Sequence, residues 1–270
     1  MADSAAARRE RIAVDVSRRG FARVTDLARR ARVSEVTVRT DLAALEAEGR
    51  ITRVHGGAMP RGFVTARESS LEQSSARASR LKRAIAVEAA SRVRSGESVL
   101  LDVGSTTLAV AQALVDRREL TELVVITNGL AIALALEPAI PRFTVVVTGG
   151  TLRSLQHSLV NPLATSLLDE VRADTAILGA TGVDAEHGVT NVNLPEAEVK
   201  RRMVAASARR ILVADSSKLG QVHLGRVATV QQLDALITDA DADPAHLDVL
   251  RATGLDVTAV AARGLGTLGS

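Results

Sequence analysis

The chain has 270 residues, which is long enough to form two domains with hydrophobic cores of their own. Cysteine is absent, so disulfide bonds, thiolate catalysis and cysteine metal sites are excluded. The histidines form no pair with metal-ligand spacing, no apolar run is long enough to cross a membrane, and no signal-peptide pattern opens the chain. We therefore expect a cytoplasmic protein with no metal, no cofactor and no membrane partner.

The charge is distributed unevenly along the chain. The whole sequence carries a net +3, but residues 1–62 hold 13 arginines against 8 acidic residues, so this segment carries +5 and the remainder −2. Such an asymmetry is typical of a nucleic-acid-binding module joined to a domain with another task, although a general preference for surface arginine would also produce it. The only aromatic residues are three phenylalanines, which disfavours stacking on single-stranded bases and leaves duplex DNA as the expected partner.

The first helix is predicted over residues 8–19. Ile12 and Val16 lie four residues apart on one side, arginines flank this stripe within reach of phosphates, and Gly20 follows the helix. A second short apolar face is formed by Val24, Leu27, Ala28 and Ala31. Only Arg32 and Val33 then remain for a tight turn before the next helix, which is the spacing of a helix-turn-helix.

The third helix begins at Ser34, a suitable N-cap, and Gly49 ends it. Its apolar positions are Val33, Val38, Leu42 and Leu45. Its polar residues near the start are the candidates for DNA contact: Ser34, Glu35, Thr37, Arg39 and Thr40. Residues 51–54 alternate like a strand and residues 55–57 like its turn, so they form a wing from which Arg53 and His55 contact the DNA backbone. On spacing alone, an ordinary three-helix module with a solvated polar face fits equally well.

The residues themselves are more specific than their spacing. The stretch VSEVTVRTDLAALEAEGRITRVHGGA, residues 33–58, resembles the N-terminal signature of the DeoR family of bacterial transcription regulators. The resemblance implies a winged helix-turn-helix that binds an operator in double-stranded DNA. One departure is Thr40, which stands where the family usually has a second arginine.

After residue 58 the pattern changes to a serine-rich segment and then to a second domain. Residues 59–79 are expected to be a linker, residues 80–263 an α/β domain that binds an effector and oligomerises, and residues 264–270 a flexible tail. Short apolar runs in this domain alternate with helical stretches, which predicts a mainly parallel sheet covered on both faces. The predicted strands are 98–101, 123–126, 143–147, 175–178, 211–214 and 235–238, and residues 256–260 are a further candidate.

Polar and glycine-rich residues follow several of these strands. Asp102 and residues 104–107 come after the first strand, and Gly104 to Thr107 could cradle a phosphate, although a capped turn without ligand is the simpler interpretation. Residues 127–129, 148–150 and 215–218 follow later strands, and ligands gather at this edge of a parallel sheet. Lysine is rare: only Lys82, Lys200 and Lys218 remain among many arginines, which suggests positions that need a compact ammonium.

The segments DVGSTT, TNGLAIA, TGGTLR and ADSSK look like the C-terminal domain of DeoR-family regulators, which is similar in fold to ribose-5-phosphate isomerase and senses a phosphorylated sugar or related metabolite. Because a single small helix-turn-helix rarely binds tightly, we expect a homo-oligomer, a dimer or a tetramer. Asn161 departs from the glycine usual in the family. The implied effector-binding residues are Asp102, Gly104, Ser105, Thr106, Thr107, Thr127, Asn128, Gly149, Gly150, Arg153, Lys200 and Lys218.

The alternative is an isomerase-like enzyme with an appended DNA-binding domain, in which Glu196 or Glu198 is the base and Lys200 its charged neighbour. The related isomerases carry a lysine in the segment that here reads DAEHG, residues 184–188, and this chain lacks it. We therefore expect no catalytic residue, and we expect Glu196 and Glu198 to be exposed. The favoured function is a repressor of a carbohydrate-metabolism operon.

Overall fold

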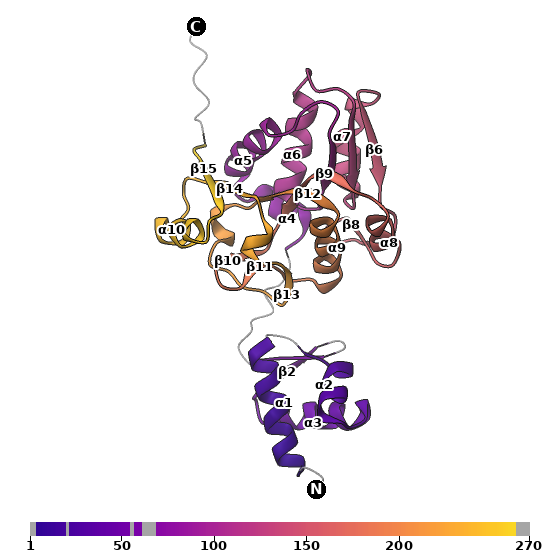
Figure 1. Ribbon diagram of the computed structural model, residues 1–270, viewed down its shortest axis with the longest axis vertical. Coiled ribbons are helices and arrows are strands. Elements are labelled where there is room, and N and C mark those ends of the chain that lie inside the picture. Colours follow the sequence, from indigo (N-terminus) through magenta and orange to yellow (C-terminus); the bar gives the residue numbers. More distant parts are fainter. Residues whose placement is uncertain (1–3, 20–21, 55–56, 61–68, 263–270) are drawn as a thin grey trace. The chain divides into compact units, whose positions relative to one another are not determined.

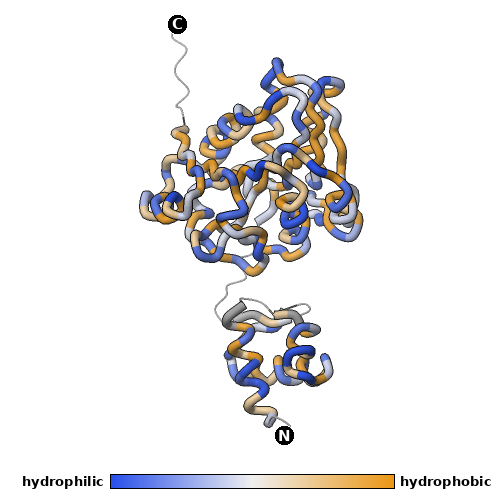
Figure 2. Tube along the Cα trace, viewed as in Figure 1, coloured by the Kyte–Doolittle hydropathy of each residue, from blue (hydrophilic) through white to orange (hydrophobic). Residues whose placement is uncertain are grey.

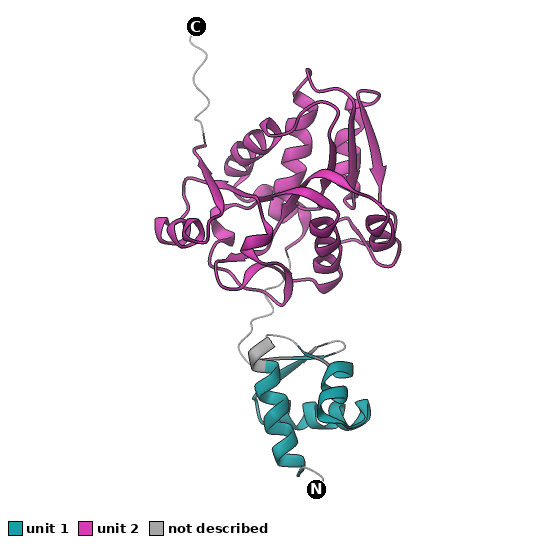
Figure 3. Cartoon of the chain, viewed as in Figure 1, with its two compact units in different colours: residues 1–66 teal, residues 67–270 magenta. Residues whose placement is uncertain are grey.

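The computed structural model describes residues 4–19, 22–54, 57–60 and 69–262. The chain divides into two compact units, residues 1–66 and 67–270 (Figure 3). Each unit has a hydrophobic core of its own.

Unit 1 is a helix-turn-helix followed by a β-hairpin that forms the wing, as predicted (Figure 1). Its β-strands join in one small antiparallel sheet in the order β1-β3-β2. Its elements are α1 (Ala5–Arg19), β1 (Ala22–Arg23), α2 (Val24–Ala31), α3 (Glu35–Ala47), β2 (Ile51–Val54) and β3 (Gly57–Pro60).

The core of unit 1 is formed by the apolar positions that the sequence predicts. Ile12 and Val16 of α1 pack against Leu27 of α2 and Leu42 and Leu45 of α3, and all five are buried. Gly49 follows the end of α3 with φ +68°, a left-handed conformation that favours glycine.

Unit 2 is built on a seven-stranded sheet in the order β15-β14-β12-β9-β4-β5-β6. Every neighbouring pair in it is parallel. The strands are β4 (Ser98–Leu101), β5 (Leu123–Thr127), β6 (Phe143–Val147), β9 (Ala173–Gly179), β12 (Ser207–Val213), β14 (Ala235–Asp239) and β15 (Asp256–Val260). The predicted α/β class and parallel sheet are confirmed.

Helices cover both faces of this sheet because side chains alternate across each strand. On one face, Val99, Leu101 and Ile177 pack against α5, α6 and α7; on the other, Leu100 and Leu178 pack against α8, α9 and α10. Figure 2 shows hydrophobic residues alternating with hydrophilic ones along the chain of both units. The helices are α5 (Ser79–Ser91), α6 (Ser105–Asp116), α7 (Leu130–Leu136), α8 (Leu163–Asp169), α9 (Leu194–Ala205) and α10 (Pro244–Ala252).

Several short elements were not foreseen. The helix α4 (Leu71–Ala76) lies within the expected linker, where a capping box between Ser70 and Gln73 starts it and buried Leu71 anchors it. The described part of unit 2 also has two small antiparallel sheets: β7 (Thr151–Arg153) pairs with β8 (Ser158–Val160), and β11 (Gly188–Asn191) lies between β10 (Gly182–Asp184) and β13 (Gly225–Ala228). Single 3-10 turns are formed by Glu137–Ala139, Ser216–Lys218 and Val230–Gln232. Among the described residues, no helix has the length and apolar character needed to cross a membrane.

Candidate functional site

The start of α3 presents polar side chains on a well-capped helix end. The Ser34 hydroxyl accepts a hydrogen bond from the Thr37 amide at 3.1 Å, so Ser34 is the N-cap that the sequence predicts. Arg39 lies one turn later and pairs with Glu35 at 3.0 Å, and 61% of its side chain is exposed. Thr40 is exposed too, and its hydroxyl donates to the Val36 carbonyl at 3.1 Å.

Val36 is a residue that the sequence reasoning missed. It lies in the first turn of α3, is 70% exposed and has no apolar neighbour that buries it. The N-terminal residues of a recognition helix contact base edges, and an apolar side chain there suits the methyl group of thymine. The sequence did contain a signal for Val36. It lies between the polar residues Glu35 and Thr37 and is not one of the buried apolar positions of α3, so its exposure could have been expected.

In the wing, Arg53 is held by a carboxylate of α3. Glu46 accepts from the Arg53 backbone amide at 2.8 Å and from its guanidinium Nε at 2.7 Å. These hydrogen bonds lower the pKa of Glu46 below its ordinary value. His55 lies outside the described residues.

The arginines of α1 are less available than expected. Arg8 donates two hydrogen bonds to buried Asp41 of α3, at 2.6 and 3.1 Å, and Arg9 pairs with Glu48 at 3.3 Å. Arg8 therefore fixes α1 against α3, because a two-pronged contact with a buried carboxylate is both specific and stabilising.

Unit 2 contains a cavity of about 420 Å³ at the carboxyl ends of the central strands. Gly104 to Thr107 follow β4, Gly179 ends β9 and is followed by Ala180 and Thr181, and Ala214 to Lys218 follow β12. Segments far apart in sequence thus meet at this edge, where parallel sheets collect ligands. All three lysines of the chain, Lys82, Lys200 and Lys218, line this cavity.

The helix α6 begins at the cavity. Gly104 precedes it with φ +145°, which favours glycine, and no side chain of the described chain caps its first turn. Backbone amides at an uncapped helix start, together with the positive end of the helix dipole, attract an anion.

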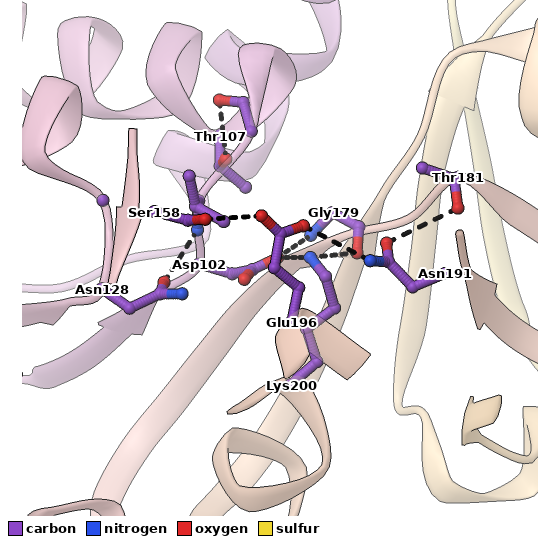
Figure 4. Close-up of polar contacts among 12 residues, drawn as sticks. Asp102, Thr107, Asn128, Ser158, Gly179, Thr181, Asn191, Glu196 and Lys200 are labelled. Atoms are coloured by element: carbon purple, nitrogen blue, oxygen red, sulfur yellow. Dashed lines mark hydrogen bonds and ion pairs between the residues drawn. The ribbon is translucent and has the colours of Figure 1, made fainter. Parts of the chain in front are cut away.

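Lys200, which lines the cavity, forms a buried ion pair with Asp102. Its ammonium donates to Asp102 Oδ2 and to the Gly179 carbonyl, the latter at 3.1 Å, and Asp102 Oδ2 also accepts from the Gly179 amide at 3.0 Å (Figure 4). Asp102 is fully buried and Lys200 is 3% exposed. Burial raises the pKa of the Asp102 carboxyl, and the Lys200 charge opposes that rise. Asp102 does not line the cavity; it positions Lys200, which does.

Glu196 lies one helical turn before Lys200 on α9 and also lines the cavity. The expectation that it is exposed is wrong: it is 4% exposed. Its Oε1 accepts from the Ser158 hydroxyl at 2.6 Å, and the Asn191 side-chain amide donates to its Oε2 at 3.4 Å (Figure 4). The Arg153 guanidinium also donates to Oε1. These partners compensate the burial of the carboxylate, and two of them, Arg153 and Ser158, are distant in sequence. Glu198 is half-buried and pairs with Arg201 and Arg202.

A second cluster of charges, around Lys82 and Asp215, also lines the cavity. Lys82 of α5 is 5% exposed and lies 3.8 Å from Asp215. Burial lowers the pKa of Lys82; the Asp215 carboxylate opposes this, and the charges of Lys218 and Arg77 add to it. Lys82 and Arg77 are site residues that the prediction missed, although the scarcity of lysine was a signal for the first.

Of the predicted effector residues, six line the cavity: Gly104, Ser105, Thr106, Thr107, Lys200 and Lys218. The other six do not line it, and two of them hold backbone beside it. The Asn128 side chain accepts from the Val103 amide at 3.0 Å and thereby shapes the turn before α6, and the Thr127 hydroxyl accepts from the Gly129 amide at 3.1 Å. Arg153 does not line the cavity, but its guanidinium donates to Glu196, which does.

Gly149 and Gly150 do not line the cavity either. Both have positive φ, +72° and +120°. A Cβ at Gly150 would lie 2.1 Å from the Val160 carbonyl oxygen, so glycine is needed there for the close approach of the β7–β8 hairpin.

No group of three or more metal-ligating side chains was found among the described residues. The site is therefore a polar cavity with buried charge pairs, an uncapped helix start and cations that face the open space. Such a cavity suits a small, hydroxyl-rich anion.

Comparison with known proteins gives consistent matches over both units. Residues 8–60 match the family model of the DeoR-like helix-turn-helix domain, and residues 77–240 match that of the DeoR C terminal sensor domain. The chain is 35% identical over 257 residues to the uncharacterized HTH-type transcriptional regulator YulB of Bacillus subtilis (strain 168), covering 94% of this chain and 96% of that one.

Two further matches indicate the range of similarity. The putative aga operon transcriptional repressor of Escherichia coli O157:H7 is 35% identical over 254 residues, covering 94% of this chain and 93% of its own. Among solved structures, ribose-5-phosphate isomerase A of Methanocaldococcus jannaschii matches 51% of this chain and 52% of its own, with 22% identity and a TM-score of 0.37.

Proposed function

Because the chain belongs to the DeoR family of DNA-binding transcriptional regulators, we propose that it represses a carbohydrate-metabolism operon under the control of a phosphorylated sugar or related metabolite. The observation that carries the proposal is the cavity of unit 2, which is lined by all three lysines of the chain and by the uncapped start of α6. The same protein has a winged helix-turn-helix. The similarity to a putative operon repressor supports the same function.

In the DNA-bound state, the first two turns of α3 enter the major groove. Arg39 contacts a guanine or a phosphate, Val36 contacts a thymine methyl group, and Arg53 holds the wing on the backbone. Arg39 is paired with Glu35 and Arg53 with Glu46 in the free protein, so DNA binding replaces these two ion pairs by contacts with DNA. A single module of this size binds weakly, and a dimer or a tetramer provides the second half-site contact.

The effector phosphate lies at the start of α6, near Lys218, and the sugar hydroxyls face Glu196, Asn191 and Thr181. The ligand controls DNA binding because it binds one arrangement of the oligomer more tightly than the other. Glu196 acts as a hydroxyl acceptor, because Arg153 and Ser158 already hold its other oxygen and it is not placed as a free base.

Two experiments test these assignments. In a gel-shift assay with the DNA upstream of its own gene, Arg39→Ala and Arg53→Ala weaken binding; a bidentate contact to guanine is worth roughly 1–3 kcal/mol. Arg80→Ala, an exposed arginine of α5 in unit 2, is the matched control. Parent-like binding by both head variants would contradict the groove assignment.

For the cavity, a thermal-shift panel of sugar phosphates is measured with the full chain. At least one compound is expected to raise the melting temperature, and Lys218→Ala is expected to remove that effect, because the ammonium lines the cavity. Turnover of a panel compound by the purified protein would instead favour the isomerase-like alternative.

A further inference from the structure

One wall of the cavity is formed by the segment that follows the boundary between the two units. Residues 69–82 comprise α4, a short turn and the start of α5. The residues of this segment that line the cavity are Ser69, Ser74, Arg77, Ala78, Leu81 and Lys82. An effector in the cavity is therefore in reach of the first helix that follows the DNA-binding unit in the chain.

This wall has an excess of positive charge. Burial lowers the pKa of Lys82, the positive charges of Arg77 and Lys218 lower it further, and the Asp215 carboxylate, 3.8 Å from the Lys82 ammonium, raises it. Within the described part of the chain, neither the Arg77 guanidinium nor the Lys218 ammonium has a hydrogen bond or an ion pair, whereas Lys82 is nearly completely buried. Three cations against one carboxylate leave about two positive charges, which matches the charge of −1.5 to −2 on a phosphate monoester.

Lys82 also holds the C-terminal end of α4. Its ammonium donates to the Ser74 carbonyl and, at 3.0 Å, to the Arg77 carbonyl. The other end of α4 is held by the hydrogen bond from the Leu71 amide to the Leu155 carbonyl at 2.9 Å. A helix of six residues is not stable in isolation, so the order of α4 depends on these contacts at its ends.

We propose that Arg77, Lys82 and Lys218 together bind the phosphate group of the effector, and that this phosphate draws the Lys82 ammonium away from the carbonyl oxygens at the end of α4. Effector binding then loosens α4, which is joined through the chain to the DNA-binding unit. The proposal rests on the proposed function, because it assumes that the cavity is the effector site.

The test uses the full chain and inorganic phosphate as the probe, with acetate as a singly charged comparison. Binding is measured by thermal shift in phosphate-free buffer for the parent, Arg77→Gln, Lys82→Met and Arg80→Gln. Arg80 is the matched control, because it lies on the same helix and is exposed but does not line the cavity. Arg77→Gln keeps the test valid if Lys82→Met does not fold, because Arg77 is exposed.

The expected result is that phosphate binds about tenfold more weakly to Arg77→Gln and Lys82→Met than to the parent and to Arg80→Gln, and that acetate binds weakly throughout. Hydrogen exchange of the amides of residues 74–78 is expected to become about tenfold faster in the parent when phosphate is bound. Equal phosphate affinity in all variants, equal binding of acetate, or unchanged exchange in α4 would overturn the proposal and leave the proposed function standing. If neither phosphate nor any sugar phosphate binds the parent, the proposed function fails first.

Discussion

The buried pair of Lys200 and Asp102 offers the most quantitative test of the structure of unit 2. Lys200→Met keeps the length and apolar stem of the side chain but removes the ammonium from a position that is 3% exposed. Asp102, which is fully buried, then lacks a compensating charge. Removal of one partner of a buried ion pair costs about 3–5 kcal/mol. For a domain of this size, that corresponds to a fall in the melting temperature of unit 2 of about 6–20 °C.

The assay is differential scanning calorimetry or far-ultraviolet circular dichroism, since the chain has no tryptophan or tyrosine for fluorescence. The double variant Asp102→Asn with Lys200→Met removes both charges, so we expect it to be more stable than Lys200→Met alone by roughly 1–3 kcal/mol. Burial raises the pKa of Asp102, and without Lys200 that carboxyl takes up a proton more readily. The destabilisation by Lys200→Met should therefore be larger at pH 8 than at pH 5.

The reasoning would be refuted if Lys200→Met unfolded within about 0.5 kcal/mol of the parent, the range of neutral surface changes. It would also be refuted if the double variant were as unstable as the sum of the single variants, because the two groups would then not be coupled.

Three further predictions concern other parts of the chain. Glu46→Gln keeps an acceptor for the Arg53 amide but removes the carboxylate that pairs with the Arg53 guanidinium, which leaves the guanidinium available to DNA. DNA affinity in a low-salt anisotropy titration should therefore rise by up to about fivefold. The rise should be larger than for the control Glu10→Gln, which removes the carboxylate paired with Arg50. Gly150→Ala should lower the free energy of unfolding, measured by urea titration, by at least about 2 kcal/mol, because the added Cβ would clash with the Val160 carbonyl oxygen. The matched control is Gly96→Ala, which should cost less, because Gly96 also has positive φ but has no atom near the added Cβ. The hydrogen bonds from Ser98 lower the pKa of the Asp174 carboxyl below its ordinary value of 3.8, so their contribution to stability is present above about that pH and is lost as the pH falls further. In urea titrations, Asp174→Asn should therefore be less stable than the parent at pH 7 and equally stable in acid. A constant difference at all pH values would contradict this prediction.

The strands of the large sheet could be predicted because they are short apolar runs, largely buried in strands such as β4, β5, β9 and β14 and partly exposed in the edge strands β6 and β15. The short antiparallel strands, such as β7 and β8, could not be predicted, because each has only three residues, too few to show an alternating pattern. The helix α4 was missed for a similar reason: Leu71 is its only buried apolar residue, and its other residues are those of a linker.

The site was predictable where residues follow a strand directly. Gly104 to Thr107 and Lys218 meet at one sheet edge, as the topology of a parallel sheet requires. Glu196 could not be placed, because its burial depends on Arg153 and Ser158, which lie 43 and 38 residues away. Its spacing of four residues from Lys200 was a signal that both side chains face the same way from α9.

The central claim is that a ligand in the cavity of unit 2 controls DNA binding by unit 1. The most direct measurement is the affinity of the full chain for labelled upstream DNA, determined by fluorescence anisotropy with and without each sugar phosphate at saturation. We predict that at least one compound changes the dissociation constant by about 5–150-fold, and that Lys218→Ala abolishes the change. A DNA affinity that no compound alters, or a response that persists unchanged in Lys218→Ala, would contradict the claim.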